Sequence, residues 1–367
     1  MKVLFLIHSL RRGGAERVVL NQAEGLVQKG HTIQIISWLD NDEYKDEYPN
    51  LERHHLIKAG EYKWIRSLRS SSKILSFRIN SFKPDIIQVH TPTVAWLLGM
   101  IKNEVPAIHI LHGYGSIDYS FSFKNFLNRM ISRFFASKTR NKFVTVSPSM
   151  NFLASKYYSN SLDDFTVIPN GIDLKKFPFI IKEDLQMHQS NPKILMIGTL
   201  TANKGQLLGI DCFKLILQDF PSAKLILIGD GPDKSTIKKK IKKFNLEASI
   251  EVLGLQSNIQ DFLSKGSILW QFSKTEAMPM TILESMSSGL PTIGFDVQGI
   301  NDTIVDNKTG FLVSYGDVEQ AALKTANILT DHILYRKLSS NSRERIIQKY
   351  SNDQMVNSYE KVMEKLL

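Results

Sequence analysis

Two glutamates eight positions apart, Glu276 and Glu284, are the residues of this chain whose types and spacing best suit shared chemistry. An Ala-Met-Pro-Met segment follows the first, a helical pattern holds the second, and Gly289-Leu290-Pro291 ends that helix. We expect Glu276 on a loop after a strand and Glu284 about two turns along the helix. Unpaired N–H groups at a helix start suit a phosphate, and carboxylates suit hydroxyl groups, as in a nucleotide sugar. The alternative is a loop acid and a solvated helix residue.

The two glutamates end an ordered series of short motifs that runs through nearly the whole chain. The other motifs are Gly13-Gly14-Ala15-Glu16, His112-Gly113, Ser147, residues 168–173, Lys204-Gly205, residues 229–232 and residues 309–312. In this order and spacing the series resembles the retaining glycosyltransferases of family 4, which carry a Glu, seven residues, Glu motif. The resemblance implies the GT-B fold, an α/β architecture of two Rossmann-like, doubly wound parallel-sheet domains facing a central cleft.

The elements that would position these motifs alternate between short β-branched runs and helical patterns, which is typical of parallel sheets covered by helices. We expect a first domain at residues 1–170, a linker that acts as a hinge at 171–192, and a second domain at 193–349. The resemblance implies that a closing helix, about 350–367, packs back on the first domain. Expected strands lie at 3–8, 32–37, 85–90, 107–111, 143–147 and 166–168, and then at 193–197, 224–228, 250–253, 268–272 and 291–295.

A nucleoside diphosphate sugar brings negative charge that must be neutralised as the sugar–phosphate bond breaks. Lys204, in a turn between a strand and a helix, is the best candidate cation, although a solvated surface lysine is the alternative. Gly13 and Gly14, in the first strand-to-helix turn, would let the backbone approach the phosphates without a Cβ in the way. A plain tight turn is their alternative.

The resemblance assigns the remaining site residues. It implies that Glu284 holds the ribose hydroxyls, that Glu276 contacts a hydroxyl of the donor sugar, and that His112 reaches this sugar from the first domain. The backbone of the segment after Glu276 would meet the distal phosphate. Leu255 and Ile259 would line the base, although core packing explains them nearly as well. The donor-binding set is completed by Thr199, Gly254, Met278, Pro279, Met280 and Thr281.

Two positions depart from the family pattern. The family usually has an arginine where this chain has Thr199, so one of two diphosphate clamps is missing and Arg12 is our candidate replacement. The family commonly has glycine after the first glutamate, where this chain has Ala277. If that position needed a positive φ, the alanine would be strained.

We expect no metal and no other cofactor. The paired aspartates Asp40/Asp42 and Asp163/Asp164 read as solvated loop acids, and His54-His55 lacks ligand spacing. No Ser/His/Asp set suggests a protein nucleophile. This fits the mechanism that the resemblance implies, in which the leaving phosphate itself takes the acceptor's proton.

The composition limits the class of protein and the cellular compartment in which it works. The chain has 367 residues, 43% of them apolar, and a single cysteine, Cys212, which precludes an internal disulfide and fits a reducing compartment. Neither the apolar start nor the longest apolar run is long enough for a signal-peptide core or a spanning helix, so we expect a cytoplasmic protein. Residues 1–180 hold 24 Lys and Arg against 15 Asp and Glu, within an overall net charge of +10. No nucleic-acid motif accompanies this charge, so an anionic membrane is the better partner.

A basic amphipathic stretch, Lys124–Lys142, stands apart in the first domain. Its apolar residues follow a helical stripe, with Arg129 and Arg133 among the basic residues outside the stripe. Such a helix can lie in the plane of a bilayer interface, where it would give peripheral contact with the inner face of the cytoplasmic membrane. The alternative is a helix that packs its stripe on the sheet.

These observations favour a retaining, metal-independent glycosyltransferase that moves a sugar, most simply from a UDP-sugar, to a glycan or lipid-linked acceptor in surface polysaccharide biosynthesis. Two alternatives share the architecture: a GT-B sugar-nucleotide epimerase, and a catalytically silent nucleotide-binding subunit, which Thr199 keeps open. A dinucleotide-dependent oxidoreductase is disfavoured, because Gly13 and Gly14 lack the third glycine of GxGxxG.

Overall fold

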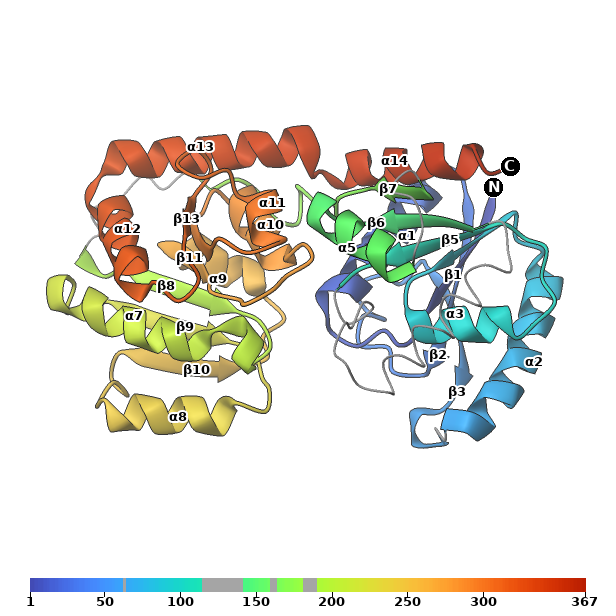
Figure 1. Ribbon diagram of the computed structural model, residues 1–367, viewed down its shortest axis with the longest axis horizontal. Coiled ribbons are helices and arrows are strands. Elements are labelled where there is room, and N and C mark those ends of the chain that lie inside the picture. The colour runs from blue at the N-terminus through green and yellow to red at the C-terminus, as the bar shows by residue number, and fades with distance from the viewer. Residues whose placement is uncertain (62–63, 114–140, 159–163, 181–189) are drawn as a thin grey trace. The chain divides into compact units, whose positions relative to one another are not determined.

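The computed structural model of the chain divides into two compact units, residues 1–171 with 352–367, and residues 172–351. It describes all residues except 62–63, 114–140, 159–163 and 181–189 (Figure 1). Each unit is built on one parallel sheet with its own hydrophobic core. The chain is therefore α/β with two Rossmann-like units, as the sequence predicts.

Unit 1 contains a seven-stranded sheet in the order β3-β2-β1-β4-β5-β6-β7. The central strands β1, β4 and β5 are almost wholly apolar and buried, as expected for a parallel sheet covered on both faces. The strands are β1 (Lys2–Ile7), β2 (Thr32–Leu39), β3 (Glu52–Ile57), β4 (Ile86–Val89), β5 (Ala107–Leu111), β6 (Asn141–Thr145) and β7 (Phe165–Val167). The sheet order reverses between β1 and β4, where loops at the carboxyl ends of adjacent strands diverge.

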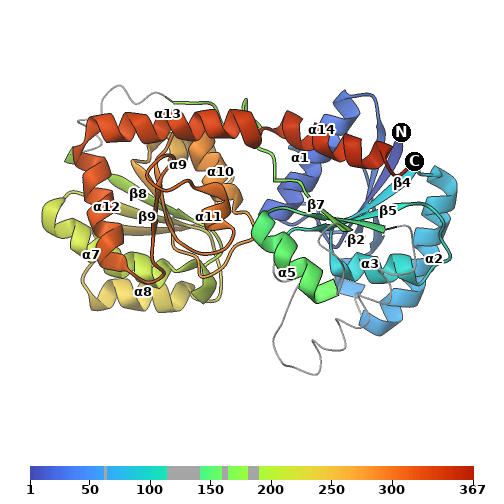
Figure 2. The same ribbon diagram turned by 45° about the horizontal axis from the view of Figure 1, so that its top comes forward.

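The helices of unit 1 cover both faces of this sheet. Helix α1 (Gly14–Gln28) packs against α14 (Asn352–Glu364), and α2 (Trp64–Phe82) packs against α3 (Pro92–Gly99). Helix α5 (Pro148–Tyr158) packs against β6 and β7. Figure 2 shows α14 beside α1. The last helix thus belongs to unit 1, where Lys29 and His31 both pair with Glu360 and the side chains of Met355, Val356, Tyr359 and Met363 are buried.

Unit 2 contains a six-stranded parallel sheet in the order β10-β9-β8-β11-β12-β13. Its strands are β8 (Lys193–Ile197), β9 (Lys224–Ile228), β10 (Ile250–Gly254), β11 (Ile268–Gln271), β12 (Thr292–Phe295) and β13 (Phe311–Val313). The chain moves outward from β8 in one direction and from β11 in the other. Because crossover connections between parallel strands are right-handed, the helices that connect consecutive strands within the two halves lie on opposite faces.

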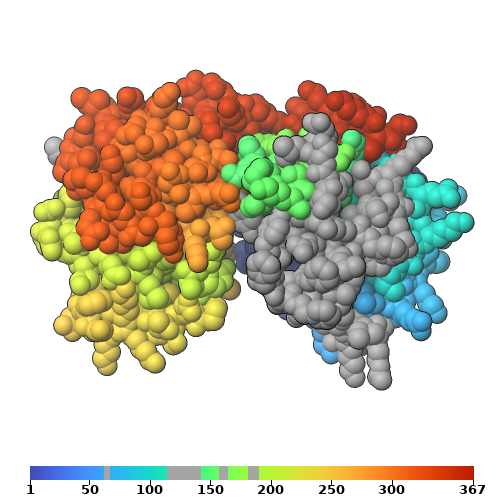
Figure 3. All heavy atoms as spheres, viewed as in Figure 1, coloured from blue at the N-terminus to red at the C-terminus, as the bar shows by residue number. Residues whose placement is uncertain are grey.

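On one face of unit 2, α7 (Gln206–Asp219) packs against α8 (Lys234–Lys243) and α12 (Val318–Thr330). On the other, α10 (Met280–Ser287) packs against α9 (Ile259–Lys265) and α13 (His332–Lys349), and a short helix, α11 (Ile300–Thr303), follows β12. Helix α8 lies at the surface (yellow in Figure 3), and its lysines at 238, 239, 242 and 243 are exposed. None of the described helices combines the length and apolar character that crossing a bilayer requires.

The segment expected to be a hinge begins inside unit 2. Ile172 and Phe177 are buried, and the carbonyl of Phe177 accepts hydrogen bonds from Ser287 and Arg343. The N–H of Ile180 donates to Ser288. Residues 172–180 are therefore packed into unit 2, which begins at Ile172, and the expected hinge stays a prediction.

Candidate functional site

The candidate site of unit 2 lies where the order of its sheet reverses. Strands β8 and β11 are neighbours in register, with Leu269 opposite Leu195, yet the chain leaves them in opposite directions. Ligands of doubly wound sheets bind in the crevice beyond the carboxyl ends of such strands. Lys204 follows β8 in a single 3₁₀ turn (Ala202–Lys204), and Glu276 lies five residues past the end of β11. The fold thus brings together two residues 72 positions apart in the sequence.

Lys204 and Glu276 form an ion pair between Nζ and Oε1. The Glu276 side chain is 12% exposed and that of Lys204 is 26% exposed, so both are partly withdrawn from water but remain accessible to a ligand. Partial burial strengthens such a pair relative to one on the open surface. The same oxygen also accepts from Ser273 Oγ at 2.6 Å and from Gln271 Nε2 at 3.1 Å.

Three donors therefore hold Oε1 of Glu276, while no hydrogen bond within the described residues uses its Oε2. An ionised carboxylate has about four lone-pair sites over its two oxygens, so Oε2 remains available to a hydroxyl group. The ammonium of Lys204 likewise has more donors than this one contact uses. The pair is thus oriented by the protein on one side and can bind a polar ligand on the other.

Sequence reasoning missed Gln271 and Ser273, which orient Glu276. Gln271 is the last residue of β11 and is buried, and its Oε1 accepts from Thr281 Oγ1 at 2.7 Å. This links the predicted residue Thr281, on the first turn of α10, to Glu276 through one side chain. The available signal was a polar Gln at the end of the apolar run Ile-Leu-Trp, since polar residues that end a buried parallel strand lie at the ligand edge.

Only glycine fits at position 205, directly after Lys204. Gly205 has φ of +70°, and a Cβ there would lie 2.1 Å from the carbonyl oxygen of Phe272. Gly299 is packed equally closely against the loop that holds Glu276, because a Cβ at position 299 would lie 1.9 Å from the carbonyl oxygen of Glu276. Close approach of the β8, β11 and β12 loops therefore fixes where Lys204 and Glu276 lie.

The second glutamate, Glu284, lies on α10 and is only 4% exposed, which excludes a solvated helix residue. Helix α10 begins after Pro279, which has no N–H and no side-chain acceptor to cap the helix. The first N–H groups of a helix have no intrahelical partner, so this end offers donors and a positive dipole end to an anion. Met278 and Met280 beside it are mostly buried.

The other predicted donor-binding positions of unit 2 flank this site at neighbouring strand ends. Thr199 is exposed and its carbonyl accepts from Gln206 Nε2 at 3.1 Å. Gly254 is the last residue of β10, and Leu255 after it is 67% exposed, unusual for a leucine, whereas Ile259 is buried. Ala277 is not among the described residues with positive φ, so the expected strain is absent.

Unit 1 places its predicted residues at the equivalent edge of its own sheet. Gly13 precedes α1, and Gly14 is its first residue. The N–H of Gly13 donates to the Tyr44 hydroxyl at 3.0 Å, and its carbonyl accepts from that hydroxyl at 3.0 Å. Its φ of −165° is ordinary extended backbone. Arg12, the proposed replacement for the missing arginine, pairs with Glu47 at 3.3 Å.

His112 follows β5 and contacts a histidine that sequence reasoning did not consider. Its Nε2 lies 3.0 Å from Nδ1 of His90, which follows the adjacent strand β4. Burial lowers the pKa of His112 to about 4 and that of His90 well below its usual range, with the neighbouring His112 adding to the latter shift. Both rings are therefore neutral at pH 7. The signal that could have found His90 is a polar residue directly after an apolar strand, as for Gln271.

A metal would need a cluster of carboxylates, imidazoles or thiolates. Among the residues that the structure describes, no three such side chains are grouped closely enough to hold an ion. Asp42 pairs with Arg53 at 3.2 Å and Asp40 accepts from the N–H of Ala59, so these two acids have structural partners. The polar groups described at the unit 2 edge are Lys204, Glu276 and the first N–H groups of α10.

Two family models match the chain, one on each unit. The model described as "Glycosyltransferase Family 4" matches residues 12–176, and that described as "Glycosyl transferases group 1" matches residues 179–345. The chain belongs to the group 1 glycosyltransferases. It is a transferase, and its two parallel sheets are those of the GT-B fold.

Curated relatives agree with this family, and a solved structure shares the fold. The N-acetyl-alpha-D-glucosaminyl L-malate synthase of Bacillus anthracis is 26% identical, over 95% of this chain and 93% of its own length. The UDP-Gal:alpha-D-GlcNAc-diphosphoundecaprenol alpha-1,3-galactosyltransferase of Escherichia coli is 26% identical over 92% and 90%. Anabaena HepE in complex with UDP-glucose superposes with a TM-score of 0.82 at 18% identity, covering 100% of both chains.

The structure thus brings together Lys204, Glu276 and Thr281 in unit 2, and places His112 against His90 in unit 1. Glu284 and the remaining predicted positions lie on elements that end or begin at the same sheet edges. The expected membrane-binding stretch lies outside the described residues up to position 140, so peripheral membrane contact stays a prediction.

Proposed function

We propose that this glycosyltransferase is a retaining, metal-independent enzyme that moves a sugar from a UDP-sugar to a carbohydrate or lipid-linked acceptor in surface polysaccharide biosynthesis. The observation that carries the proposal is the ion pair of Lys204 and Glu276 at the reversal of the unit 2 sheet, with Oε1 of Glu276 held by three donors. In a doubly wound sheet, this is where a nucleotide ligand binds.

The chemistry of the pair fits a nucleotide sugar. As the sugar–phosphate bond breaks, negative charge grows on the diphosphate, and Lys204 with the first N–H groups of α10 can stabilise it without reorganising. The free Oε2 of Glu276 can accept from a sugar hydroxyl and offset positive charge that develops on the sugar ring. Buried Glu284 suits the ribose hydroxyls, because one carboxylate can accept both hydrogen bonds. Exposed Leu255 suits the face of a base.

The donor and acceptor classes are supported by the proteins that the chain resembles. The Escherichia coli relative is named for a UDP-Gal donor and a diphosphoundecaprenol-linked acceptor, and the Anabaena structures hold UDP or UDP-glucose. We extend the base and the acceptor class from these proteins to this chain as part of the proposal.

Binding and turnover test the proposal in one design. A thermal-shift panel of UDP, GDP and ADP with their sugars should raise the melting temperature most for UDP compounds, since a ligand of the native state stabilises it. With the matching UDP-sugar alone, slow release of UDP is expected, and NMR of a product made on a lipid-linked acceptor should show the anomeric configuration of the donor. Excess EDTA should leave the rate unchanged.

Each failure has a distinct meaning. A UDP-induced shift with no release of UDP or product would indicate a silent nucleotide-binding subunit. Conversion of the donor to an isomer or free sugar without any use of acceptor would indicate the epimerase alternative. Inversion at the anomeric carbon, or loss of activity in EDTA that Mn²⁺ restores, would overturn the retaining or the metal-independent part of the proposal.

A further inference from the structure

Helix α8 carries a dense positive charge that the proposed donor chemistry does not use. Its ten residues contain six lysines and no acidic residue. Unit 2 holds 22 Lys and Arg against 19 Asp and Glu, so without these six lysines it has 16 against 19. The positive charge of an otherwise slightly acidic unit is therefore concentrated on one helix, and an anionic surface would attract and orient the unit through α8.

Four of the six lysines are exposed and have no acidic partner. Lys234 pairs with Asp230 at 2.9 Å, and Lys240 pairs with Asp211 at 2.6 Å, so these two serve contacts within the unit. No ion pair within the described residues engages the other four, which are Lys238, Lys239, Lys242 and Lys243. Their ammonium groups are therefore available to a partner outside the unit.

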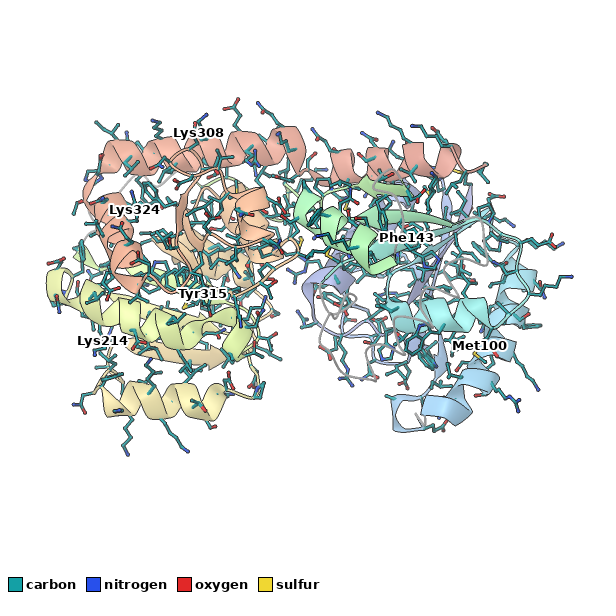
Figure 4. The ribbon with its side chains drawn as sticks, viewed as in Figure 1. Met100, Phe143, Lys214, Lys308, Tyr315 and Lys324 are labelled. Carbon is teal, nitrogen blue, oxygen red and sulfur yellow. The ribbon has the colours of Figure 1, made fainter. Side chains whose placement is uncertain are left out.

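A fifth lysine extends this surface at the end of the helix. Lys214 of α7 (labelled in Figure 4) is exposed, and its Nζ lies 3.9 Å from the ring centroid of Phe244, the residue after α8. Nζ of Lys243 lies 5.9 Å from the same centroid. Within α8 itself the apolar residues Ile237 and Ile241 are buried. We call the five exposed lysines, at positions 214, 238, 239, 242 and 243, the lysine surface.

The stability of α8 does not account for the lysine surface. The helix dipole favours cations in the last turn, where Lys242 and Lys243 lie. Lys238 and Lys239 each lie four positions before one of these two residues, and like charges at this spacing on a helix repel each other. An anionic partner would compensate this repulsion.

The residue types of the lysine surface distinguish between classes of anionic partner. Protein interfaces are anchored by aromatic residues and arginine and are depleted in lysine, and α8 has no arginine and no exposed aromatic residue. Single-stranded nucleic acid needs rings on which its bases stack, and two ammonium groups lie over the ring of Phe244. A bilayer of anionic lipids needs only clustered lysines on the exposed side of a helix.

We propose that the lysine surface docks this chain on the headgroups of an anionic lipid bilayer. The contact is electrostatic and does not insert into the bilayer, because the apolar side of α8 is buried in unit 2. It is separate from the stretch at residues 124–142 and does not rest on the proposed donor chemistry. The lysine surface does not hold the donor, so turnover of the purified protein without lipid does not depend on it.

Co-sedimentation of the full chain with vesicles compares two variants that lose the same charge. The first carries Lys238→Gln, Lys239→Gln, Lys242→Gln and Lys243→Gln. The second, the matched control, changes four exposed lysines elsewhere in unit 2, namely Lys265→Gln, Lys308→Gln, Lys337→Gln and Lys349→Gln. Glutamine forms helices about as well as lysine, so the melting temperature of both variants should stay near that of the wild type.

The expected result is a loss of vesicle binding in the first variant alone. One lysine near an anionic surface is worth about five-fold in partitioning. On vesicles of phosphatidylglycerol and phosphatidylcholine we therefore expect the first variant to bind at least about ten-fold more weakly than the control. The difference should vanish on phosphatidylcholine alone and at about 0.5 M salt, where charges are screened. Equal binding of the two variants, or a difference that persists without anionic lipid, would overturn the proposal.

Amine labelling of the wild-type chain, read by mass spectrometry, locates the contact directly. Adding the phosphatidylglycerol vesicles should protect the lysines at 238, 239, 242 and 243 from acetylation and leave Lys308 and Lys337 reactive. If the protein sediments with vesicles while its α8 lysines stay fully reactive, another surface holds it and the proposal is wrong. Protection by a DNA duplex but not by the vesicles would also overturn it, in favour of nucleic acid as the partner.

Discussion

Both sheets carry polar side chains beyond the carboxyl ends of their strands, but the two sets of side chains differ in charge. At the reversal of the unit 2 sheet, the chain places an ion pair, Lys204 with Glu276, fixed by Ser273 and Gln271. At the reversal of the unit 1 sheet, Arg12 in the turn after β1 is paired with Glu47, and the ends of β4 and β5 carry two neutral histidines, His90 and His112, which contact each other. The ends of β4 and β5, which we call the neutral edge, thus differ from the charged edge that Lys204 and Glu276 form in unit 2.

The difference shows which kind of ligand group each edge suits. A charged edge with free donors suits the part of a substrate on which charge develops, here the diphosphate and the sugar ring. A neutral edge, kept neutral by burial, suits uncharged hydroxyl or ether oxygens, where a fixed charge would gain little and would cost desolvation energy. In the proposed reaction, the charged edge of unit 2 would thus stabilise the leaving group.

The largest expected effect is loss of the cation from the charged edge. Lys204→Ala removes the ammonium and leaves Glu276 with two neutral donors, so negative charge on the leaving diphosphate is no longer compensated. We expect kcat with the UDP-sugar to fall roughly 100- to 1,000-fold, as when a preorganised electrostatic contact is removed elsewhere. Steady-state kinetics on purified protein measure this effect.

Lys239→Ala is the matched control for this variant, because Lys239 is an exposed lysine of the same unit. It belongs to α8, the helix that lies at the surface (yellow in Figure 3). The control variant should leave both kcat and the melting temperature near their wild-type values. If Lys204→Ala retained full turnover, the charged edge would not be the site of the reaction.

The second largest expected effect is on the free energy of unfolding, and it compares a glycine substitution at each sheet edge. Gly205→Ala forces a positive φ on alanine and drives its Cβ into the Phe272 carbonyl, so we expect a loss of unfolding free energy on the order of 3 kcal/mol. Gly13→Ala meets only the end of the flexible Glu16 side chain, in extended backbone, and should cost less than about 1 kcal/mol. Urea unfolding of both variants compares them directly, and equal losses would contradict the structure.

Much of this arrangement could be predicted from the sequence, because the alternation of apolar runs and helical patterns determines the order of the elements. The strand expected at 3–8 appears as Lys2–Ile7, and that expected at 193–197 appears with the same bounds. The sequence also predicts Lys204 and Glu276 as site residues, since both follow strands and match known motifs. The strand expected at 85–90 ends one residue earlier, which leaves His90 outside the ladder.

The sequence does not reveal the residues that orient the side chains of the site. Gln271 and Ser273 match no motif, and their role depends on β11 lying beside β8, which only the folded sheet establishes. His90 contacts His112 because β4 and β5 are neighbours, although 22 positions separate them. The start of the expected linker packs into unit 2 for a related reason: the carbonyl of Phe177 accepts hydrogen bonds from Ser287 and Arg343, far along the chain.

The smallest expected effect is a pH dependence confined to the neutral edge. In the folded state burial depresses the pKa of His112 to about 4, against 6.5 for the free side chain, and it depresses the pKa of His90 in the same direction. The unfolded chain therefore binds more protons between about pH 6.5 and 4. The stability that this neutrality provides is complete above pH 6.5 and is lost as the pH falls toward 4. Between pH 7 and 5 His112 alone should account for about 2 kcal/mol.

Hydrogen exchange resolved by peptide can separate the two edges in this experiment. After correction for intrinsic exchange rates, peptides of β4 and β5 should lose protection between pH 7 and 5 more than those of β8 and β11, since local stability differs across a structure. In His112→Asn the difference should shrink, because one of the two titrating groups is gone while the carboxylates of the chain are unchanged. Equal losses in both sheets, or an unchanged difference in His112→Asn, would mean that the histidines are not held neutral by the fold.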